Sequence, residues 1–316
     1  VAAGNIGRAL SDVALSAERP DWMALEASSF QLHDTPGIAP TVGVLTNLSP
    51  DHLDRYPSVD AYYADKALLY RHATATSRWV VNADDALASA LGMGAAGARW
   101  GFSRRDRLAA AHCDDATDAL VLLGEPLLPR AALPLPGWHN VENVLAALLA
   151  VMVASVAHRT PTARAALAAA VQTFRGLPHR LELVADRDGV RWINDSKATN
   201  VTSARVAIEA MAQPTVVLLG GKHKGEPYTS LVAPLLQHAK LVIAYGEAEA
   251  LIVGDLGVYV PVVRGGSSFE EIMQRARAAA RPGDAVLLAP ACSSFDMFTN
   301  YEARGEAFRR LAQHAP

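Results

Sequence analysis

Cysteine is nearly absent from this sequence, which has only Cys113 and Cys292 among its 316 residues. The two lie far apart and form no CxxC pair, so a disulfide framework and a structural zinc site are both excluded. Basic runs are absent as well: no five consecutive residues are Lys or Arg, and 29 basic residues stand against 32 acidic ones. The formal net charge of −3 gives no reason to expect a nucleic acid partner.

Long hydrophobic runs are also missing. The longest apolar stretch, residues 144–157, is shorter than the ~18 residues that a membrane span needs, so we expect a buried helix there and no membrane partner. The chain opens on Val1, with neither an initiator Met nor a basic-then-apolar signal peptide. Together with the scarcity of cysteine, these absences predict a cytoplasmic protein, which we expect to be a monomer.

Hydrophobic residues make up 51% of the chain and charged residues 19%, so large cores can be buried. The length suits two domains of roughly 150 residues each. A boundary is expected at residues 174–178, where a helix ends, Gly176 can cap it and Pro178 prevents its continuation. The predicted domains are therefore 1–176 and 177–316.

Short β-rich runs alternate with Ala-rich helical runs, which predicts an α/β fold of two domains, each with a largely parallel sheet flanked by helices. Buried strands are expected at residues 41–46, 79–82, 192–194, 215–219, 241–245 and 285–289. Helices are expected at residues 140–156, 161–173, 202–211 and 269–280, where Ala, Leu and Val recur at helical spacing. Residues 120–135, interrupted by Gly and Pro, indicate a β-hairpin or an edge excursion.

Polar clusters follow several of these apolar runs, and ligands of open α/β sheets bind at the carboxyl ends of strands. Glu26 could hold a magnesium ion near a phosphate, or it could be a surface carboxylate or helix cap. Asp51, His52 and Asp54 directly follow a predicted strand, which suits a cation or proton-transfer site, or equally an Asx-turn before a capped helix.

Asn140 and Asn143 lie three residues apart, so they share one face of the long apolar helix. They could bond an adenine edge or simply cap the helix. In the second half, residues 194–200 place Asp, Ser, Lys, Thr and two Asn within seven residues after a strand, which suits a nucleotide's ribose and phosphates.

Two further clusters follow strands of the second half. Residues 218–225 contain three glycines and two lysines but lack the GxxxxGK[ST] spacing of a phosphate loop. This segment could pair with a carboxylate substrate or be a Gly-rich turn with solvated lysines. Residues 287–296 are small and hydroxylic, so their backbone N–H groups could approach an anion, whereas Cys292 is expected to be a packed, inert thiol.

Taken together and in this order, the clusters resemble the Mur ligase family. The central ATPase domain of that family is matched by GNIG at 4–7, the segment around Glu26, DHLDRY at 51–56, YADK at 63–66 and HNVEN at 139–143. Its Rossmann-like C-terminal domain is matched by PHRLE at 178–182, NDSKATN at 194–200, APACSSFD at 289–296 and NYE at 300–302. The last group is similar to the D-glutamate-adding members in particular. The resemblance runs from Gly4 to Phe308. The set of motifs in this order is more specific than any single motif.

This resemblance implies an ATP-dependent, ADP-forming amide synthesis that supplies peptidoglycan precursors, with ATP and Mg²⁺ as cofactors. The substrates would be UDP-N-acetylmuramoyl-L-alanine, whose carboxylate attacks the γ-phosphate of ATP, and D-glutamate, whose amine then attacks the acyl phosphate. Phosphorylation supplies the leaving group that a bare carboxylate lacks. Most of the catalysis is then positioning and charge neutralisation.

The resemblance also implies roles for individual residues. The metal would be held by Glu26, His52 and a carbamylated Lys66, and the catalytic group would comprise Lys66, His52 and Asp51. ATP would be bound by Asn140, Asn143, Arg180, Asp195 and Lys197. The acceptor substrate and D-glutamate would be bound by Asn5, Ser28, His179, Thr199, Lys222 or Lys224, Ser294, Phe295 and Tyr301.

Two parts of the family pattern do not occur in this sequence: an N-terminal domain that binds the UDP moiety, and a GxxGK[ST] phosphate loop shortly before the GNIG segment. The expectation is an N-terminally truncated piece of a ligase that is inactive as it stands. Phosphate release by the 316-residue chain with both substrates present would contradict this expectation. Two alternatives stay open: another Mur or folylpolyglutamate-type ligase, and a non-catalytic homologue that binds nucleotide or a wall precursor.

Overall fold

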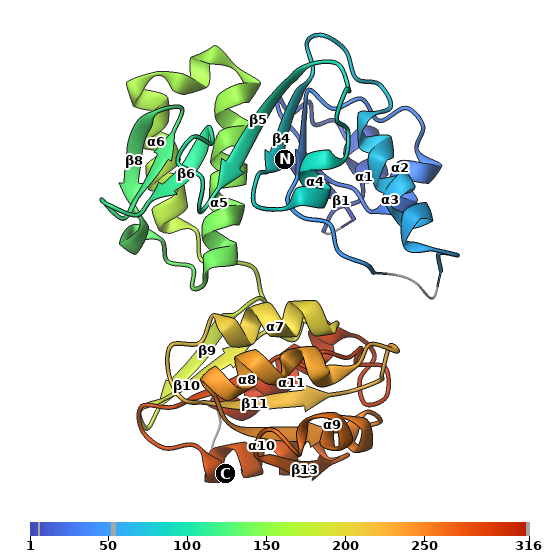
Figure 1. Cartoon of the computed structure of the whole chain (residues 1–316), viewed down its shortest axis with the longest axis vertical. Coiled ribbons are helices and arrows are strands. Elements are labelled where there is room, and N and C mark those ends of the chain that lie inside the picture. The colour runs from blue at the N-terminus through green and yellow to red at the C-terminus, as the bar shows by residue number, and fades with distance from the viewer. Residues whose placement is uncertain (6, 52–54, 314–316) are drawn as a thin grey trace. The chain divides into compact units, whose positions relative to one another are not determined.

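The computed structural model describes residues 1–5, 7–51 and 55–313. The chain divides into two compact units (Figure 1). The first unit comprises Val1–Pro134 and Val141–Thr173, and the second comprises Leu135–Asn140 and Phe174–Pro316. The functional domain limits of 1–176 and 177–316 stay a prediction.

The first unit is built on a six-stranded sheet with the order β3-β4-β5-β6-β7-β8. Its strands are β3 (Val42–Leu45), β4 (Arg78–Asn82), β5 (Ala98–Ser103), β6 (Ala111–Asp114), β7 (Ala119–Leu122) and β8 (Glu125–Pro129). Strands β3 to β6 pair in parallel, and β7 and β8 continue the sheet as an antiparallel hairpin. The hairpin confirms the prediction for residues 120–135.

Helices and a small second sheet complete the first unit. The helices are α1 (Leu10–Leu15), α2 (Ser29–Asp34), α3 (Val59–Ala67), α4 (Ala86–Ala90), α5 (Trp138–Ala154), whose first turn belongs to the second unit, and α6 (Pro161–Thr173). Strands β1 (Ala2–Gly4) and β2 (Ala24–Glu26) form a separate parallel pair. The predicted helices 140–156 and 161–173 correspond to α5 and α6.

Strand β3 differs from its prediction as a buried strand. It ends the sheet, and it is buried on one face only. Gly43 and Leu45 face the core, where a side chain at Gly43 would collide with the ring of Trp79, whereas Val44 on the other face is 38% exposed. Hydrophobic composition alone does not distinguish a strand covered on both faces from one covered on a single face.

The second unit contains a six-stranded sheet with the order β13-β12-β11-β14-β10-β9, parallel except for β9. Its strands are β9 (Glu182–Arg187), β10 (Val190–Asn194), β11 (Thr215–Gly220), β12 (Ala239–Tyr245), β13 (Val262–Gly266) and β14 (Ala285–Leu288). Every residue of β11 is buried, because a central parallel strand is covered on both faces. Together the two units confirm the predicted fold class.

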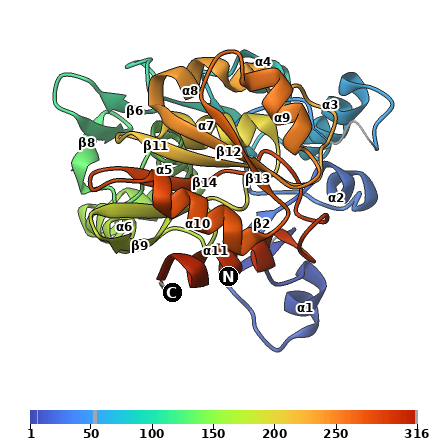
Figure 2. The same ribbon diagram turned by 90° about the horizontal axis from the view of Figure 1, so that it is seen from below.

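Helices cover both faces of this sheet (Figure 2). One face packs against α7 (Val201–Glu209), α8 (Val232–His238) and α9 (Glu249–Leu256), which contribute Ile208, Leu235 and Ile252 to one apolar cluster. The other packs against α10 (Phe269–Ala279) and α11 (Tyr301–Gln313), which contribute Ile272 and Phe308 to a second cluster.

The arrangement of helices defines a switch point in the second sheet. The chain leaves β10 toward α7 on one face, and it leaves the neighbouring strand β14 toward α11 on the opposite face. Loops that diverge in this way leave a crevice at the carboxyl ends of the strands, where open α/β sheets bind ligands. The polar clusters after β10, β11 and β14 all lie at this edge.

Within the described ranges 1–5, 7–51 and 55–313, none of the helices combines the length and the apolar character that a bilayer crossing requires.

Candidate functional site

In the first unit, Asn5 and Glu26 are held together at the end of the small parallel pair. The backbone N–H of Asn5 donates to Glu26 O at 2.8 Å, and its Nδ2 donates to Glu26 Oε1 at 3.2 Å. Gly4 lies opposite Glu26 with φ +117°, and a Cβ at this position would collide with the Glu26 carbonyl. The close approach that presents the Glu26 carboxylate therefore requires glycine.

Ser28 has a structural role of its own as the N-cap of α2. Its Oγ accepts from the backbone N–H of Gln31 at 3.2 Å, and Gln31 Oε1 accepts from the backbone N–H of Ser28 at 3.0 Å. This reciprocal pair is a capping box. A substrate contact by Ser28 stays a prediction.

Lys66, on α3, lies close to two carboxylates. Burial lowers the pKa of its ammonium, and the negative charges of Asp51 and Glu26 oppose this shift. The nearby Tyr62 has its pKa raised to about 12, mainly by burial and then by Asp51. The structure thus brings Glu26, Asp51 and Lys66 into one electrostatic group. The predicted site residue His52, and Asp54 beside it, lie outside the described residues.

Asp65, which sequence reasoning did not single out, connects three segments around this group. Its Oδ1 lies 2.9 Å from His33 Nδ1 on α2, and its Oδ2 accepts from the hydroxyl of Tyr56 at 2.9 Å. The hydrogen bond and charge of Asp65 raise the pKa of His33. The sequence feature that could have identified Asp65 as a site residue is its position in the YADK motif, immediately before Lys66.

Among the described residues, no three or more His, Cys, Asp or Glu side chains are grouped so that they could hold a metal ion. The group around Lys66 offers two carboxylates and one ammonium, and an ammonium repels a cation. Converted to a carbamate, the same side chain would offer oxygen atoms, the donors that Mg²⁺ prefers. Among the described residues, the donor set therefore fits magnesium better with a carbamate at Lys66 than with an ammonium.

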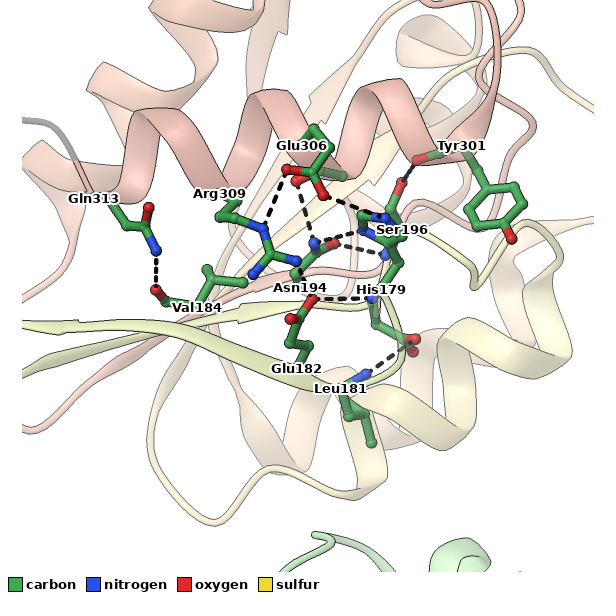
Figure 3. A network of polar contacts seen from close by, with 12 residues as sticks. His179, Leu181, Glu182, Val184, Asn194, Ser196, Tyr301, Glu306, Arg309 and Gln313 are labelled. Carbon is green, nitrogen blue, oxygen red and sulfur yellow. Dashed lines mark hydrogen bonds and ion pairs between the residues drawn. The ribbon is translucent and has the colours of Figure 1, made fainter. Parts of the chain in front are cut away.

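In the second unit, His179 and Asn194 form the centre of a buried polar network (Figure 3). Asn194 Nδ2 lies 3.0 Å from His179 Nδ1 and donates to Gly305 O at 3.2 Å, while Asn194 Oδ1 accepts from the backbone N–H of Ser196 at 3.1 Å. A Cβ at Gly305 would collide with the His179 ring. The network joins the end of β10 to α11.

Charged side chains complete this network on its other side (Figure 3). Glu182 Oε2 accepts from the backbone N–H of His179 at 3.0 Å and from Arg309 Nη2 at 2.8 Å. The carboxylate of Glu306 lies between His179 and Arg309, 3.6 Å from His179 Nε2 and 3.3 Å from Arg309 Nε. Both ring nitrogens of His179 thus have neighbours, which fixes the orientation of the imidazole.

Asp195, at the end of β10, is a buried carboxyl group. Desolvation raises its pKa to about 7, against the opposing effects of a backbone hydrogen bond from Leu181 and the charge of Arg180. His179 and Leu181 both have positive φ, 63° and 43°, so the backbone on either side of Arg180 is strained. Strain and a displaced pKa at one strand end are typical of functional sites.

The first turn of α5, which belongs to the second unit, lies close enough to Arg180 to feel its charge. Burial, assisted by the charge of Arg180, lowers the pKa of His139 to about 4, so this imidazole is neutral near pH 7. Asn140 Nδ2 donates to Pro136 O at 2.7 Å, and Asn143 is exposed on α5. Their adenine contacts stay a prediction.

Lys197 and Tyr301 are in direct contact with each other. Lys197 Nζ donates to the Tyr301 hydroxyl at 3.1 Å and lies 4.4 Å from the centroid of its ring. The backbone N–H of Thr199 donates to Lys197 O at 2.8 Å, so the loop after β10 is tightly folded. The structure thus brings Lys197 and Tyr301 into direct contact and places Thr199 two residues along the loop.

The loops after β11 and β14 are joined by a pair of backbone hydrogen bonds. Lys222 N–H donates to Ser293 O at 2.9 Å, and Ser293 N–H donates to Lys222 O at 3.1 Å. The side chains of Lys222 and Lys224 are exposed, Ser294 is buried, and Phe295 is 69% exposed. These residues therefore lie along one edge of the sheet, on the two strand exits beside the switch point.

Cys292 is buried, and burial raises its thiol pKa to about 11, in agreement with the prediction of an inert thiol. Its Sγ lies 3.0 Å from the Tyr228 hydroxyl, which is 2.9 Å from His223 Nδ1. This chain of contacts ties the loop after β11 to the loop after β14 a second time.

Comparison with known proteins places this arrangement in a family. Residues 6–151 match the model of the Mur ligase middle domain, and residues 179–292 match that of the Mur ligase glutamate ligase domain. A UDP-N-acetylmuramoylalanine–D-glutamate ligase from Nitrosococcus oceani is 39% identical over 328 residues, covering 99% of this chain and 68% of the relative. The chain belongs to the Mur ligase family. This confirms the resemblance found from the sequence motifs.

Other members of the Mur ligase family are also similar to this chain. A protein of the same name from Acidobacterium capsulatum is 41% identical over 316 residues, covering 98% of this chain and 66% of the relative. The chain therefore spans about two thirds of the length of these curated relatives. Among solved structures, a MurF from Acinetobacter baumannii has a TM-score of 0.65 at 14% identity, with 92% of this chain and 64% of that chain covered.

Two more solved structures show how widely this fold occurs. The UDP-N-acetylmuramate–alanine ligase MurC from Thermotoga maritima has a TM-score of 0.63 at 18% identity and covers 92% of this chain and 63% of that one. FolC from E. coli, solved with DHPP and ADP, has a TM-score of 0.64 at 16% identity, with coverages of 92% and 66%. At these identities the likeness concerns the fold alone.

Proposed function

We propose that this chain provides the catalytic and amino-acid-binding domains of a UDP-N-acetylmuramoylalanine–D-glutamate ligase. The observation that carries the proposal is the match to relatives of that name along 98% or more of the chain at 39–41% identity. The geometry supports it, since basic and hydroxyl side chains gather at the switch point of the second sheet. We propose ATP and Mg²⁺ as the cofactors. We also propose that the protein is cytoplasmic and that it is a monomer.

The reaction would proceed through an acyl phosphate. The carboxylate of UDP-N-acetylmuramoyl-L-alanine attacks the γ-phosphorus of ATP, and ADP leaves. The amine of D-glutamate then attacks the acyl carbon, loses a proton, and inorganic phosphate leaves as the amide forms. The first step joins two anionic groups, and the second brings D-glutamate, with its two carboxylates, to an acyl phosphate, so the protein must supply positive charge and fixed geometry.

In the first unit, Glu26 and a carbamylated Lys66 would hold Mg²⁺, with Asp51 beside them and His52 as a further ligand. Bound Mg²⁺ would neutralise phosphate charge. Carbamylation requires a neutral amine, and burial lowers the pKa of Lys66 in that direction. Asn5, bonded to the Glu26 carboxylate at 3.2 Å, would orient it and lie near the acceptor substrate.

The carbamate can be tested directly on the 316-residue chain. Incubation with ¹³C-bicarbonate is expected to give one carbamate carbon resonance that disappears in the Lys66→Arg variant. The control is Lys240→Arg, because Lys240 forms an ion pair with Asp284 at 2.7 Å in the other unit. An unchanged carbamate signal in Lys66→Arg, or no signal in the unaltered chain, would contradict the assignment.

In the second unit, D-glutamate would lie at the exits of β10, β11 and β14. Its two carboxylates would be bound by Lys222 or Lys224 and by backbone N–H groups near Ser294, with Thr199, Phe295 and Tyr301 enclosing it. ATP would be bound here by Arg180, Asp195 and Lys197, and Asn140 and Asn143 stay predicted nucleotide-binding residues. His179, fixed by its network, would position the adjoining turn toward the acceptor substrate.

Calorimetric titration of D-glutamate into the chain, with an ATP analogue present, tests this assignment. Lys222→Gln and Lys224→Gln each remove an exposed cation, and we expect one of them to weaken binding about tenfold or more. Lys240→Gln, in the same unit, is the matched control and should bind as the unaltered chain does. Equal affinities of all four proteins would exclude both lysines from the site.

A further inference from the structure

Arg304 is a buried arginine whose hydrogen-bonding capacity is fully used. It lies on α11 with 1% of its surface exposed. Nε donates to Ser196 Oγ at 2.9 Å and Nη2 to Ser196 O at 2.9 Å. Both Nη atoms donate to Cys292 O at 3.2 Å, and Nη1 also donates to Ser293 O at 3.3 Å. Because a guanidinium has five N–H groups, none is left to bind a ligand.

The acceptors come from the loops after β10 and β14, the two strands on either side of the switch point. A third exit packs against the same group: a Cβ added to Gly221, at the end of β11, would lie 3.1 Å from Arg304 Nη1 and would collide with Ser293 O. Gly221 has φ +130°, so glycine is needed there both for the backbone conformation and for the space. One side chain therefore bonds to two strand exits and packs against a third.

Among the residues with a described placement, no carboxylate bonds directly to Arg304. The nearby carboxylate of Asp296 acts on the same neighbours, Tyr245 and Cys292, only through its charge. In the part of the chain that the structure describes, no Asp or Glu lies within ion-pair distance of it, and all five bonds go to neutral oxygens. Burying a cation without a counter-charge is costly. The cost is reduced if an anion binds at this edge of the sheet, because the low dielectric lets the charge act over several ångströms.

We propose that Arg304 is the positioning residue of the D-glutamate pocket, acting through the backbone of three loops and not by touching the ligand. The inference rests on the proposed function. The residues that Arg304 bonds to or packs against include the direct neighbours of predicted ligand residues: Ser196 precedes Lys197, Gly221 precedes Lys222, and Ser293 precedes Ser294. Ser196 Oγ also donates to Tyr301 O at 2.8 Å, which extends the same support to Tyr301.

The decisive variant is Arg304→Ala, studied with and without millimolar guanidinium, because the ion can refill the space that the side chain leaves. Arg304→Lys is the conservative variant and should fail, since one ammonium cannot meet three carbonyls and a hydroxyl in a plane. Arg310→Ala is the matched control, because Arg310 lies on the same helix with an exposed side chain. Sodium chloride at the same concentration controls for ionic strength.

D-glutamate affinity, measured well below the unfolding temperature, is expected to fall about 10- to 100-fold in Arg304→Ala and Arg304→Lys. Guanidinium should restore affinity to Arg304→Ala but not to Arg304→Lys, and Arg310→Ala should be unchanged. A residue with only a structural role would lower the unfolding temperature while the folded protein kept its affinity. That result would overturn the proposal.

Hydrogen exchange gives a second measurement that needs no ligand. In Arg304→Ala, amides of residues 195–198, 221–223 and 292–294 should lose protection together and regain it with guanidinium, while the core amides of β11 stay protected. Independent changes in the three segments, or none, would contradict the proposal. If the unaltered chain binds no D-glutamate, the proposed function fails, and hydrogen exchange still decides whether Arg304 couples the three exits.

Discussion

Asp195→Asn is expected to remove the loss of stability of the second unit that the ionisation of Asp195 causes between about pH 4 and pH 7. The pKa of Asp195 is raised from 3.8 to about 7, chiefly by desolvation. The folded state therefore keeps a proton that the unfolded state releases. The stabilisation is fully present below the unfolded pKa and is lost as the pH rises through the folded one, a loss of about 4 kcal/mol from a shift of this size.

Asparagine keeps the oxygen that accepts from Leu181 N–H at 3.3 Å but cannot ionise, so the variant should lack this loss of stability. What remains is the opposing effect of His139, whose lowered pKa of about 4 makes stability rise with pH over the same range. The measurement is the free energy of unfolding at several pH values, followed by hydrogen exchange in β11 and β14. Asp186→Asn, on the antiparallel edge strand β9, is the control. An equal pH dependence in Asp195→Asn and the unaltered chain would show that Asp195 ionises normally.

Asn194→Ala is expected to destabilise the second unit by about 3 kcal/mol. The substitution removes the contacts to His179, Gly305 and Ser196 from a site with no solvent exposure. The Ser196 N–H then remains buried without a partner, which costs about 1–3 kcal/mol, and the bonds to His179 and Gly305 are lost as well, at about 1 kcal/mol each. Urea unfolding of the second unit, followed by hydrogen exchange, measures the effect.

Asn300→Ala is the matched control, because Asn300 is exposed and its Oδ1 accepts one bond, from Ala303 N–H at 2.7 Å. The loss of this helix cap should cost about 1 kcal/mol. Similar losses in the two variants would mean that the network around Asn194 does not hold α11 to β10.

The parts of the fold that were predictable are those with an uninterrupted apolar run. Strand β11 is buried at all six positions, and its sequence TVVLLG needs no tertiary information to be recognised. Strand β13 was missed because VVRGG contains an arginine and two glycines, and it pairs with β12 at the sheet edge. Its existence depends on that pairing, which a single sequence does not show.

The candidate site was predictable to the extent that its residues follow strands. Residues 194–200 and 287–296 were found from their polarity after apolar runs, and the structure places both beside the switch point. Arg304 and Asp65 were missed because a charged residue in an amphipathic helix is usually solvated. The signal for Arg304 was its spacing, four residues before the fully buried Phe308 on the same helix face.

The most direct test of the central claim is whether the chain distinguishes the two enantiomers of glutamate. Calorimetric titration with an ATP analogue present should give D-glutamate the tightest binding, with L-glutamate, diaminopimelate, L-lysine and D-alanyl-D-alanine weaker by about tenfold or more. D-glutamate binding should give a calorimetric signal. This signal should disappear when the lysine that binds the glutamate carboxylate, Lys222 or Lys224, is replaced by Gln. Equal binding of L- and D-glutamate, or preferential binding of another amino acid, would contradict assignment to the D-glutamate-adding ligases.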